Sequence, residues 1–235
     1  MEKMMNVFQL YLKVFLMREI KQEYSLMEIA SFIDEVLVKN PQWAKLHNEN
    51  CYKNYCFNSF YKPEPDGKYR KEQVYQIMIR SVDRNLMQYL EENLPKHENA
   101  SMKGLVCSIT IVKQRHIKAL YSITPVVVKG PGQTYWRDEM DFAQFGQQIK
   151  VNLIKKYQGL LGGEINENIE LFTLLELTNR TPIAIPYKSV KLLADKVQMQ
   201  IADNLVAQQL AFMSLGTGAG TMNARGYGFV NAHFM

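Results

Sequence analysis

Hydrophobic side chains recur with two different spacings in the first part of the chain. Residues 7–17 alternate between apolar and polar types, and this period of two predicts a β-strand. Over residues 29–37 the apolar positions take the spacing of one helix face, and Pro41 ends the predicted helix. Ser25 and Glu28 have the spacing of a capping box just ahead of it. The pattern therefore begins with a strand followed by a helix.

The same two spacings continue through the rest of the first half. Extended segments are predicted at residues 55–61 and 73–80, an amphipathic helix at 82–90 and a β-rich segment at 104–114. Together with the first strand and helix, these elements give the order β-α-β-β-α-β. This order is typical of a ferredoxin-like unit.

The second half repeats this order of elements with different residues. We expect, in chain order, an extended segment, a long helix, two extended segments, a helix and a last strand over residues 120–128, 142–157, 169–178, 183–202, 205–213 and 226–234. The repeat is therefore one of structure and not of sequence.

Length and composition bound the number of domains and their class. The 235 residues leave room for one large domain or two small ones. Apolar residues make up 47% and charged residues 22%, which excludes long disorder, collagen-like repeats and a coiled coil. Because each half has a complete set of elements, we predict an α+β protein of two tandem ferredoxin-like domains, residues 1–118 and residues 119–235.

Cysteine use and hydropathy indicate the compartment. The three cysteines include no CxxC pair, which argues against a disulfide framework or a zinc knuckle. We expect free thiols in a reducing cytosol, and no metal or other cofactor. The apolar stretch at 7–17 is interrupted by Gln9 and Lys13, and no segment approaches the roughly 20 apolar residues that span a bilayer. A cytoplasmic protein is therefore expected.

Five glycines cluster near the C-terminus, between residues 216 and 228. They follow a predicted helix and precede a strand, and neither a Rossmann GxGxxG nor a P-loop Gly-Lys-Ser/Thr is present. Glycine lets a backbone pass close to a large ligand, and successive N–H groups can form an anion-binding concavity. Asn223 and Arg225 add side chains suited to RNA. A flexible loop without a ligand is the alternative, and glycine content alone leaves both open.

The spacing within this cluster matches a known family. Gly218-Ala219-Gly220, five residues and then Gly226-Tyr227-Gly228 resemble the C-terminal signature of the CRISPR-associated endoribonucleases that cut precursor CRISPR RNA within its repeats, members of the RAMP superfamily. Residues 124–128 (Thr-Pro-Val-Val-Val) and the tandem ferredoxin-like order are also similar to that family, so the resemblance covers essentially the whole chain. Non-cleaving relatives carry glycine-rich loops too.

The resemblance implies a chemistry and two catalytic residues. Family members cut RNA without a metal, by attack of the neighbouring 2′-OH, and leave a 5′-hydroxyl and a 2′,3′-cyclic phosphate. A catalytic His just after the first helix, with a Lys six residues on, corresponds here to His47 and Lys53. His47 would be general acid or base and Lys53 would stabilise the phosphate. The alternative for His47 is a surface histidine in a polar loop.

The third catalytic residue departs from the family pattern. Some members place a catalytic tyrosine on the first helix, where this chain has Phe32, and phenylalanine cannot transfer a proton. We take Tyr24, just before the helix, as the candidate replacement; Tyr52 and Tyr55, near Lys53, are alternatives.

The other three histidines have simpler interpretations. His97 lies in a polar loop and is expected to be solvated. His116 lies in a basic run and is expected to contact phosphate. His233 is two residues from the C-terminus.

Basic residues predict where RNA lies. The net charge of +5 suits a polyanion partner but is modest. Cations interleaved with aromatic side chains near the predicted junction suit a groove that follows an RNA backbone, although a charge run is usually a solvated face. We expect RNA in the cleft between the domains. The candidate RNA contacts are Gly218, Gly220, Asn223, Arg225, Gly226, Gly228, Lys113, Arg115, Lys118, Lys188 and Lys191, and Lys129, Tyr135, Trp136 and Arg137 lie near the same junction.

Three functions fit these observations. The first is a metal-independent endoribonuclease that cuts a CRISPR repeat to generate guide RNAs. The second is a non-cleaving RAMP-type subunit that holds CRISPR RNA in an interference complex with other subunits. The third is a generic RNA-recognition-motif protein, which the absence of an aromatic RNP1 signature disfavours. A monomer and a homodimer are both compatible with the sequence.

Overall fold

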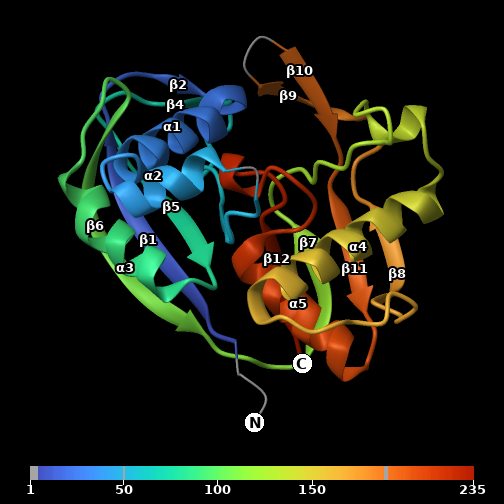
Figure 1. The fold of residues 1–235 in the computed structure, drawn as a ribbon. Helices are drawn as coiled ribbons and strands as arrows, with labels where there is room; N and C mark the ends of the chain where they lie inside the picture. Colours follow the sequence, from blue (N-terminus) through green and yellow to red (C-terminus); the bar gives the residue numbers. More distant parts are fainter. Residues whose placement is uncertain (1–4, 50, 188–189) are drawn as a thin grey trace.

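The computed structural model describes residues 5–49, 51–187 and 190–235, and its first half is built on a four-stranded antiparallel sheet (Figure 1). The strand order is β3-β5-β1-β6, which is the ferredoxin-like order. The side chains of Leu10, Leu12 and Val14 on β1 are fully buried, as the period of two predicts. Two helices pack on this sheet through a shared hydrophobic core. The elements are β1 (Val7–Leu16), α1 (Ser25–Leu37), β3 (Tyr55–Phe57), β5 (Val74–Ser81), α3 (Arg84–Asn93) and β6 (Met102–Val112).

The second half repeats this arrangement. Its sheet has the order β12-β7-β11-β8, so each strand takes the same place in the order as its counterpart in the first sheet. A hairpin of β9 (Ile183–Tyr187) and β10 (Val190–Ala194) is inserted between β8 and β11. Two tandem ferredoxin-like units are thereby confirmed. The other elements are β7 (Ile117–Ser122), α4 (Phe142–Leu161), β8 (Phe172–Leu177), β11 (Val197–Ile201), α5 (Leu205–Thr217) and β12 (Val230–Phe234).

Shorter elements complete the chain. Within the described ranges, a two-stranded pair and four 3₁₀ turns connect the larger elements, and helix α2 (Pro41–Asn48) follows α1. The remaining elements are β2 (Ile20–Lys21), β4 (Lys68–Tyr69), η1 (Gln22–Tyr24), η2 (Leu94–Lys96), η3 (Trp136–Asp138) and η4 (Asn223–Arg225).

Helix α2 is the main difference from the predicted elements. Pro41 ends the first predicted helix, but it also begins α2, because proline fits the first position of a helix. Asn40 caps this second helix by accepting a hydrogen bond from the backbone N–H of Gln42 at 2.9 Å. His47 therefore lies in the last turn of a helix and not in a polar loop.

The predicted capping box is also wrong. Ser25 is the first residue of α1, and its hydroxyl donates to the carbonyl of Gln22 at 2.7 Å because η1 runs directly into the helix. A capping box occurs instead at the start of α4, between Asp141 and Gln144.

The two halves meet along α5. This helix contacts β1, β3 and β5 of the first sheet as well as strands of its own sheet. Arg80 on β5 donates to the carbonyl of Val230 at 2.9 Å, and its guanidinium lies 4.6 Å from the ring centroid of Phe229. The connection between the sheets runs from the end of β6 at Val112 to the start of β7 at Ile117. A division of the chain at residue 118 stays a prediction.

The helices of the described segments carry no stretch of the length and hydropathy that crossing a membrane requires.

Candidate active site

A cleft of about 710 Å³ lies between the two halves. One wall comes from the ends of α1 and α2 and from the segment that leads to β3. The other comes from α4, from residues before it and from the segment after α5, which lies near the centre of the molecule in Figure 1. The titratable and polar residues that line it include Asp34, His47, Tyr52, Lys53, Lys129, Lys156, Asn223 and Arg225.

His47 is held at this cleft through one ring nitrogen. Its Nδ1 lies 3.2 Å from Oδ1 of Asp34, and the two side chains are 23% and 19% exposed. A carboxylate in this position favours the tautomer with the proton on Nδ1. No described residue bonds the other nitrogen, Nε2, which leaves it available to exchange a proton with a molecule in the cleft.

Asp34 also joins the two halves of the chain. Its second oxygen, Oδ2, accepts a hydrogen bond from the guanidinium of Arg225, which lies within the glycine segment of the second half. The Asp34 carboxylate is thus shared between a histidine of the first half and an arginine of the second. The resulting cluster places a proton-transfer group and a fixed cation within one cleft.

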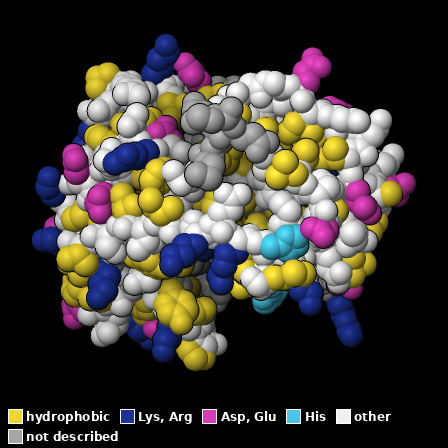
Figure 2. All heavy atoms as spheres, turned by 90° about the horizontal axis from the view of Figure 1, so that it is seen from below, with side chains coloured by type: hydrophobic (Ala, Val, Ile, Leu, Met, Phe, Trp, Pro, Cys, Tyr) yellow, Lys and Arg dark blue, Asp and Glu magenta, His cyan; other side chains and the backbone are white. Residues whose placement is uncertain are grey.

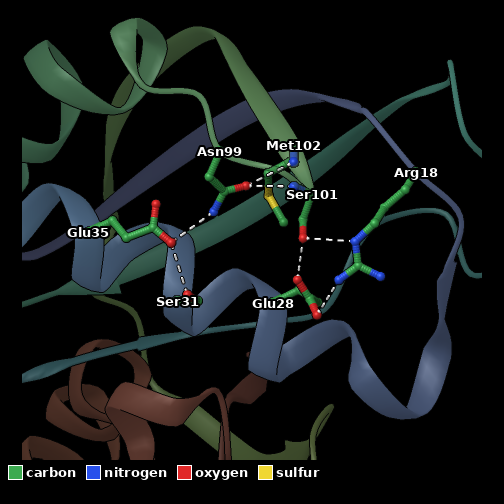
Figure 3. Close-up of polar contacts among 7 residues, drawn as sticks. All are labelled: Arg18, Glu28, Ser31, Glu35, Asn99, Ser101 and Met102. Carbon is green, nitrogen blue, oxygen red and sulfur yellow. Dashed lines mark hydrogen bonds and ion pairs between the residues drawn. The ribbon is translucent and has the colours of Figure 1, made fainter.

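A hydrogen-bonded clamp on α1 keeps this helix in place (Figure 3). Glu28 accepts hydrogen bonds from Arg18 at 2.7 Å and from the hydroxyl of Ser101 at 2.5 Å. Glu35, near the end of the helix, accepts one from the amide of Asn99 at 3.0 Å. These contacts tie α1 to the segments after β1 and before β6, so the carboxylate that meets His47 stands on an anchored element.

Lys53 lines the cleft with its charge turned toward α2. Its Nζ donates to the carbonyl of Glu49 at 2.5 Å and to that of Leu46, which caps the C-terminal end of the helix that carries His47. The predicted pair His47 and Lys53 is therefore brought together. A phosphate that bound Lys53 would take it from these carbonyls.

Tyr24 is not brought to the cleft. It lies in η1, ten residues before Asp34, and a helix rise of 1.5 Å per residue separates them by about 15 Å. Phe32 is fully buried in the core. Both alternatives line the cleft, but Tyr55 is buried, whereas Tyr52 is 39% exposed. Of these two, Tyr52 is therefore the more accessible to a molecule in the cleft.

The glycine segment folds around a buried lysine. The carbonyls of Gly218 and Gly220 accept hydrogen bonds from Nζ of Lys156 at 2.8 Å and 3.0 Å, and both glycines have a positive φ, of 74° and 68°. Asn223 is buried and accepts from the same Nζ at 2.7 Å through Oδ1. Its Nδ2 donates to the carbonyls of Ala219 and Tyr227. The segment is thus held in a closed loop by the side chains of Lys156 and Asn223.

Three N–H groups of the glycine segment are bonded within the protein and are not available to an anion. The N–H groups of Gly218, Gly226 and Gly228 donate to carbonyls of the protein, and the glycines are buried. At Gly228 a Cβ would lie 1.9 Å from the carbonyl oxygen of Ala219, which explains the glycine by close packing. Contact of RNA with these glycines and with Asn223 stays a prediction.

Lys156 is a site residue that sequence reasoning missed. It lies on α4 at helical spacing from Ile149 and Leu153, so it belongs to the buried face of this helix, where a lysine is unusual. Burial lowers the pKa of Lys156 to about 7. A lysine within an apolar stripe was the signal that could have found it.

The predicted basic surface lies outside the cleft. Lys113, Arg115 and Lys118 are exposed on or next to the connection between the sheets, and Arg115 covers the ring of Phe234 at 4.4 Å. In the view from below, Lys and Arg side chains are scattered among apolar and acidic ones (Figure 2). Lys191 is exposed on β10, and Lys188 lies outside the described residues.

The aromatic and basic run near the junction has internal contacts. Tyr135, Trp136 and Arg137 all donate to the carboxylate of Asp195, which is fully buried. Lys129, in contrast, lines the cleft. Residues 135–137 therefore stabilise the second half through Asp195, whereas Lys129 contributes to the wall of the cleft.

The remaining histidines differ from one another. His97 is only 8% exposed, and its Nε2 is hydrogen-bonded to Oε2 of Glu35 at 2.9 Å. The prediction that His97 is solvated is therefore wrong. His116 lies 3.8 Å from Asp203, and His233 stacks on Tyr121.

The cysteines and the possible metal ligands complete the inventory of the site. Cys51, Cys56 and Cys107 are free. Across residues 5–49, 51–187 and 190–235, no three His, Cys, Asp or Glu side chains gather as a metal site.

Known proteins similar to this chain carry related descriptions. No protein-family model matches it. Over 212 residues it is 20% identical to the CRISPR-associated endoribonuclease Cas6 2 of Methanocaldococcus jannaschii, covering 83% of this chain and 87% of that one. A solved RAMP protein described as binding different RNA substrates superposes with a TM-score of 0.70 at 17% identity, covering 96% and 99% of the two chains. A Cas6-related protein from Pyrococcus furiosus gives 0.68 at 16% identity, covering 97% and 98%. These similarities confirm the resemblance to the CRISPR repeat-processing RAMP proteins and show that this chain has their fold of two tandem ferredoxin-like domains.

Proposed function

We propose that the chain is an endoribonuclease that cleaves CRISPR repeat RNA in the cleft between its two halves. The observation that carries this proposal is His47, which lines a cleft large enough for a nucleotide and lies with Nδ1 3.2 Å from the carboxylate of Asp34. The similarity to a CRISPR-associated endoribonuclease over most of the chain supports the same reaction.

The proposed reaction needs only groups of the protein and the RNA. The 2′-oxygen of one nucleotide attacks the adjacent phosphorus, a new P–O2′ bond forms, and the bond from phosphorus to the 5′-oxygen breaks. The proton of the 2′-OH passes to a base, and the leaving 5′-oxygen takes a proton from an acid. The products are a 2′,3′-cyclic phosphate and a 5′-hydroxyl.

The residues of the cleft divide these tasks. Nε2 of His47 performs one of the two proton transfers, and the hydroxyl of Tyr52, an exposed tyrosine of the cleft lining, performs the other. Arg225 and Lys53 supply positive charge for the phosphate as its charge develops, and Lys53 does so after leaving the end of α2.

A second candidate function is RNA binding without cleavage. The contact of Lys53 with the α2 carbonyls favours it, because a cation held there is withdrawn from the phosphate. A RAMP protein described as binding different RNA substrates has the same fold.

Replacing Asp34 by Asn tests the role of His47. Arg225 would keep the oxygen of the introduced amide as its acceptor, so the amide would direct its N–H to Nδ1 of His47 and place the ring proton on Nε2. We expect single-turnover cleavage of repeat RNA to fall about 100-fold, within the range for general acid–base groups, at nearly unchanged RNA affinity.

The matched control is Asp203→Asn, which removes a carboxylate beside another histidine, His116. It should leave the rate unchanged. Equal rates for Asp34→Asn and wild type would show that His47 does not depend on this carboxylate.

A further inference from the structure

Lys156 is a buried cation that the proposed reaction does not use. Lys156 is 2% exposed, and no carboxylate in the described part of the chain lies within ion-pair distance of its Nζ. Burying an uncompensated ammonium is costly, so the contacts that it makes must offset the lost hydration. The acceptors that bond Nζ therefore show which part of the chain Lys156 holds in place.

Among the described residues, every hydrogen-bond acceptor of Lys156 belongs to one short segment of the chain. Nζ bonds the carbonyls of Gly218 and Gly220 and Oδ1 of Asn223, all within 3.0 Å, and approaches the carbonyl of Thr217 at 3.5 Å. Carbonyl oxygens repel one another when they converge on a point. A cation at that point makes the convergence favourable, so Lys156 on α4 gathers the whole segment around itself.

This segment leads directly to the catalytic cluster. Asn223 is the first residue of η4, a single turn closed by the bonds from Arg225 N to Met222 O and from Gly226 N to Asn223 O, both 2.9 Å. Two residues after the lysine-bound Asn223, the side chain of Arg225 reaches Asp34. A displacement of Asn223 would carry Arg225 with it, because one tight turn holds both.

We propose that Lys156 is a positioning residue for the cleft. By fixing Asn223 and the glycine carbonyls, it sets the turn from which Arg225 binds Asp34, and through Asp34 it fixes the ring of His47. Its consequence for cleavage rests on the proposed function, whereas the placement of Arg225 is measurable without any RNA.

The test compares Lys156→Met with Lys155→Met, which removes the exposed neighbouring lysine of the same helix. The Nε–H NMR signal of Arg225, assigned by its loss in Arg225→Ala, reports whether the guanidinium is held. We expect this signal to move toward that of a free arginine in Lys156→Met and to stay in place in Lys155→Met. An unmoved signal in Lys156→Met would overturn the proposal.

Single-turnover cleavage at saturating RNA gives the second measurement. Lys156→Met and Arg225→Ala should slow cleavage by similar factors, and the double variant should be no slower than Arg225→Ala alone. Losses that multiply in the double variant would mean that Lys156 acts independently of Arg225, against the proposal. If wild type does not cleave, the proposed function fails, and the NMR signal still decides the positioning.

A second variant covers a failure of Lys156→Met to fold. Lys156→Gln keeps two N–H donors on a shorter side chain. It should shift the Arg225 signal part of the way, and a signal identical to that of wild type would contradict the proposal.

Discussion

Replacing His47 by Ala should reduce single-turnover cleavage of repeat RNA by about 10²- to 10⁴-fold, the range that a general acid or base contributes. The variant removes the proton-transfer group in the cleft and leaves Lys53, Arg225 and the rest of the site in place. RNA affinity should therefore change little. Rates under single-turnover conditions, together with a dissociation constant from filter binding, measure the two effects separately.

His233→Ala is the control for this experiment. His233 is exposed and stacks on Tyr121 near the C-terminus, outside the residues that line the cleft. We expect wild-type rates from it. Cleavage by His47→Ala at the wild-type rate would show that His47 takes no part in the mechanism.

Lys156 should make the stability of the fold depend on pH. Burial lowers the pKa of its ammonium to about 7, whereas in the unfolded chain the group titrates with a pKa of about 10.4. Between these values the unfolded state binds the extra proton, so raising the pH favours the folded state. The contribution to the free energy of unfolding should rise by up to about 1.4 kcal/mol per pH unit above pH 7 and level off near pH 10.

Urea unfolding of wild type and Lys156→Met at several pH values measures this contribution. Other titrating groups are common to both proteins and cancel in the difference, so the difference should grow in favour of wild type as the pH rises from 7 to 9. Wild type and Lys155→Met should keep a constant difference over the same range, because Lys155 is exposed. A constant difference for Lys156→Met as well would mean that the buried lysine keeps an ordinary pKa.

Much of the fold could be predicted from periodicity because its cores are regular. The alternation of β1 and the helical spacing of α1 arise from burial on one face of each element, and the structure shows that burial. The periodicity does not predict helix α2, because Trp43 is the one buried residue in it and its apolar spacing is weak. Pro41 is also ambiguous, since a proline can either end the preceding helix or begin a new one.

The site was only partly predictable for a different reason. The resemblance to a family indicated His47 and Lys53, and side-chain chemistry indicated Arg225 as an RNA contact; the fold brings these three to one cleft. Asp34 could not be predicted, and the apolar stripe marks Lys156 as unusual without showing what it contacts, because the partners lie far away in sequence: Asp34 and Arg225 are 191 residues apart, and Lys156 and Asn223 are 67 apart. Long-range polar contacts leave no periodic trace in a single sequence.

The glycine motif points to the family, but the contacts of its glycines differ from the phosphate contacts that the motif suggests. Its spacing pointed to the family, but its glycines are explained by close packing and by positive φ around Lys156. The backbone presents carbonyl groups to a lysine of the protein, whereas the motif suggests N–H groups for a phosphate.

The most direct test of the account is single-turnover cleavage of the repeat RNA encoded beside the gene, with wild-type protein in EDTA. Two substrates are compared, the all-ribose repeat and the same repeat with one 2′-deoxynucleotide at the cleavage position. We expect one cut in the all-ribose RNA, with 5′-hydroxyl and 2′,3′-cyclic phosphate ends, and binding without a cut for the deoxy substrate. Tight binding with no cut in either RNA, or cleavage of both, would contradict it.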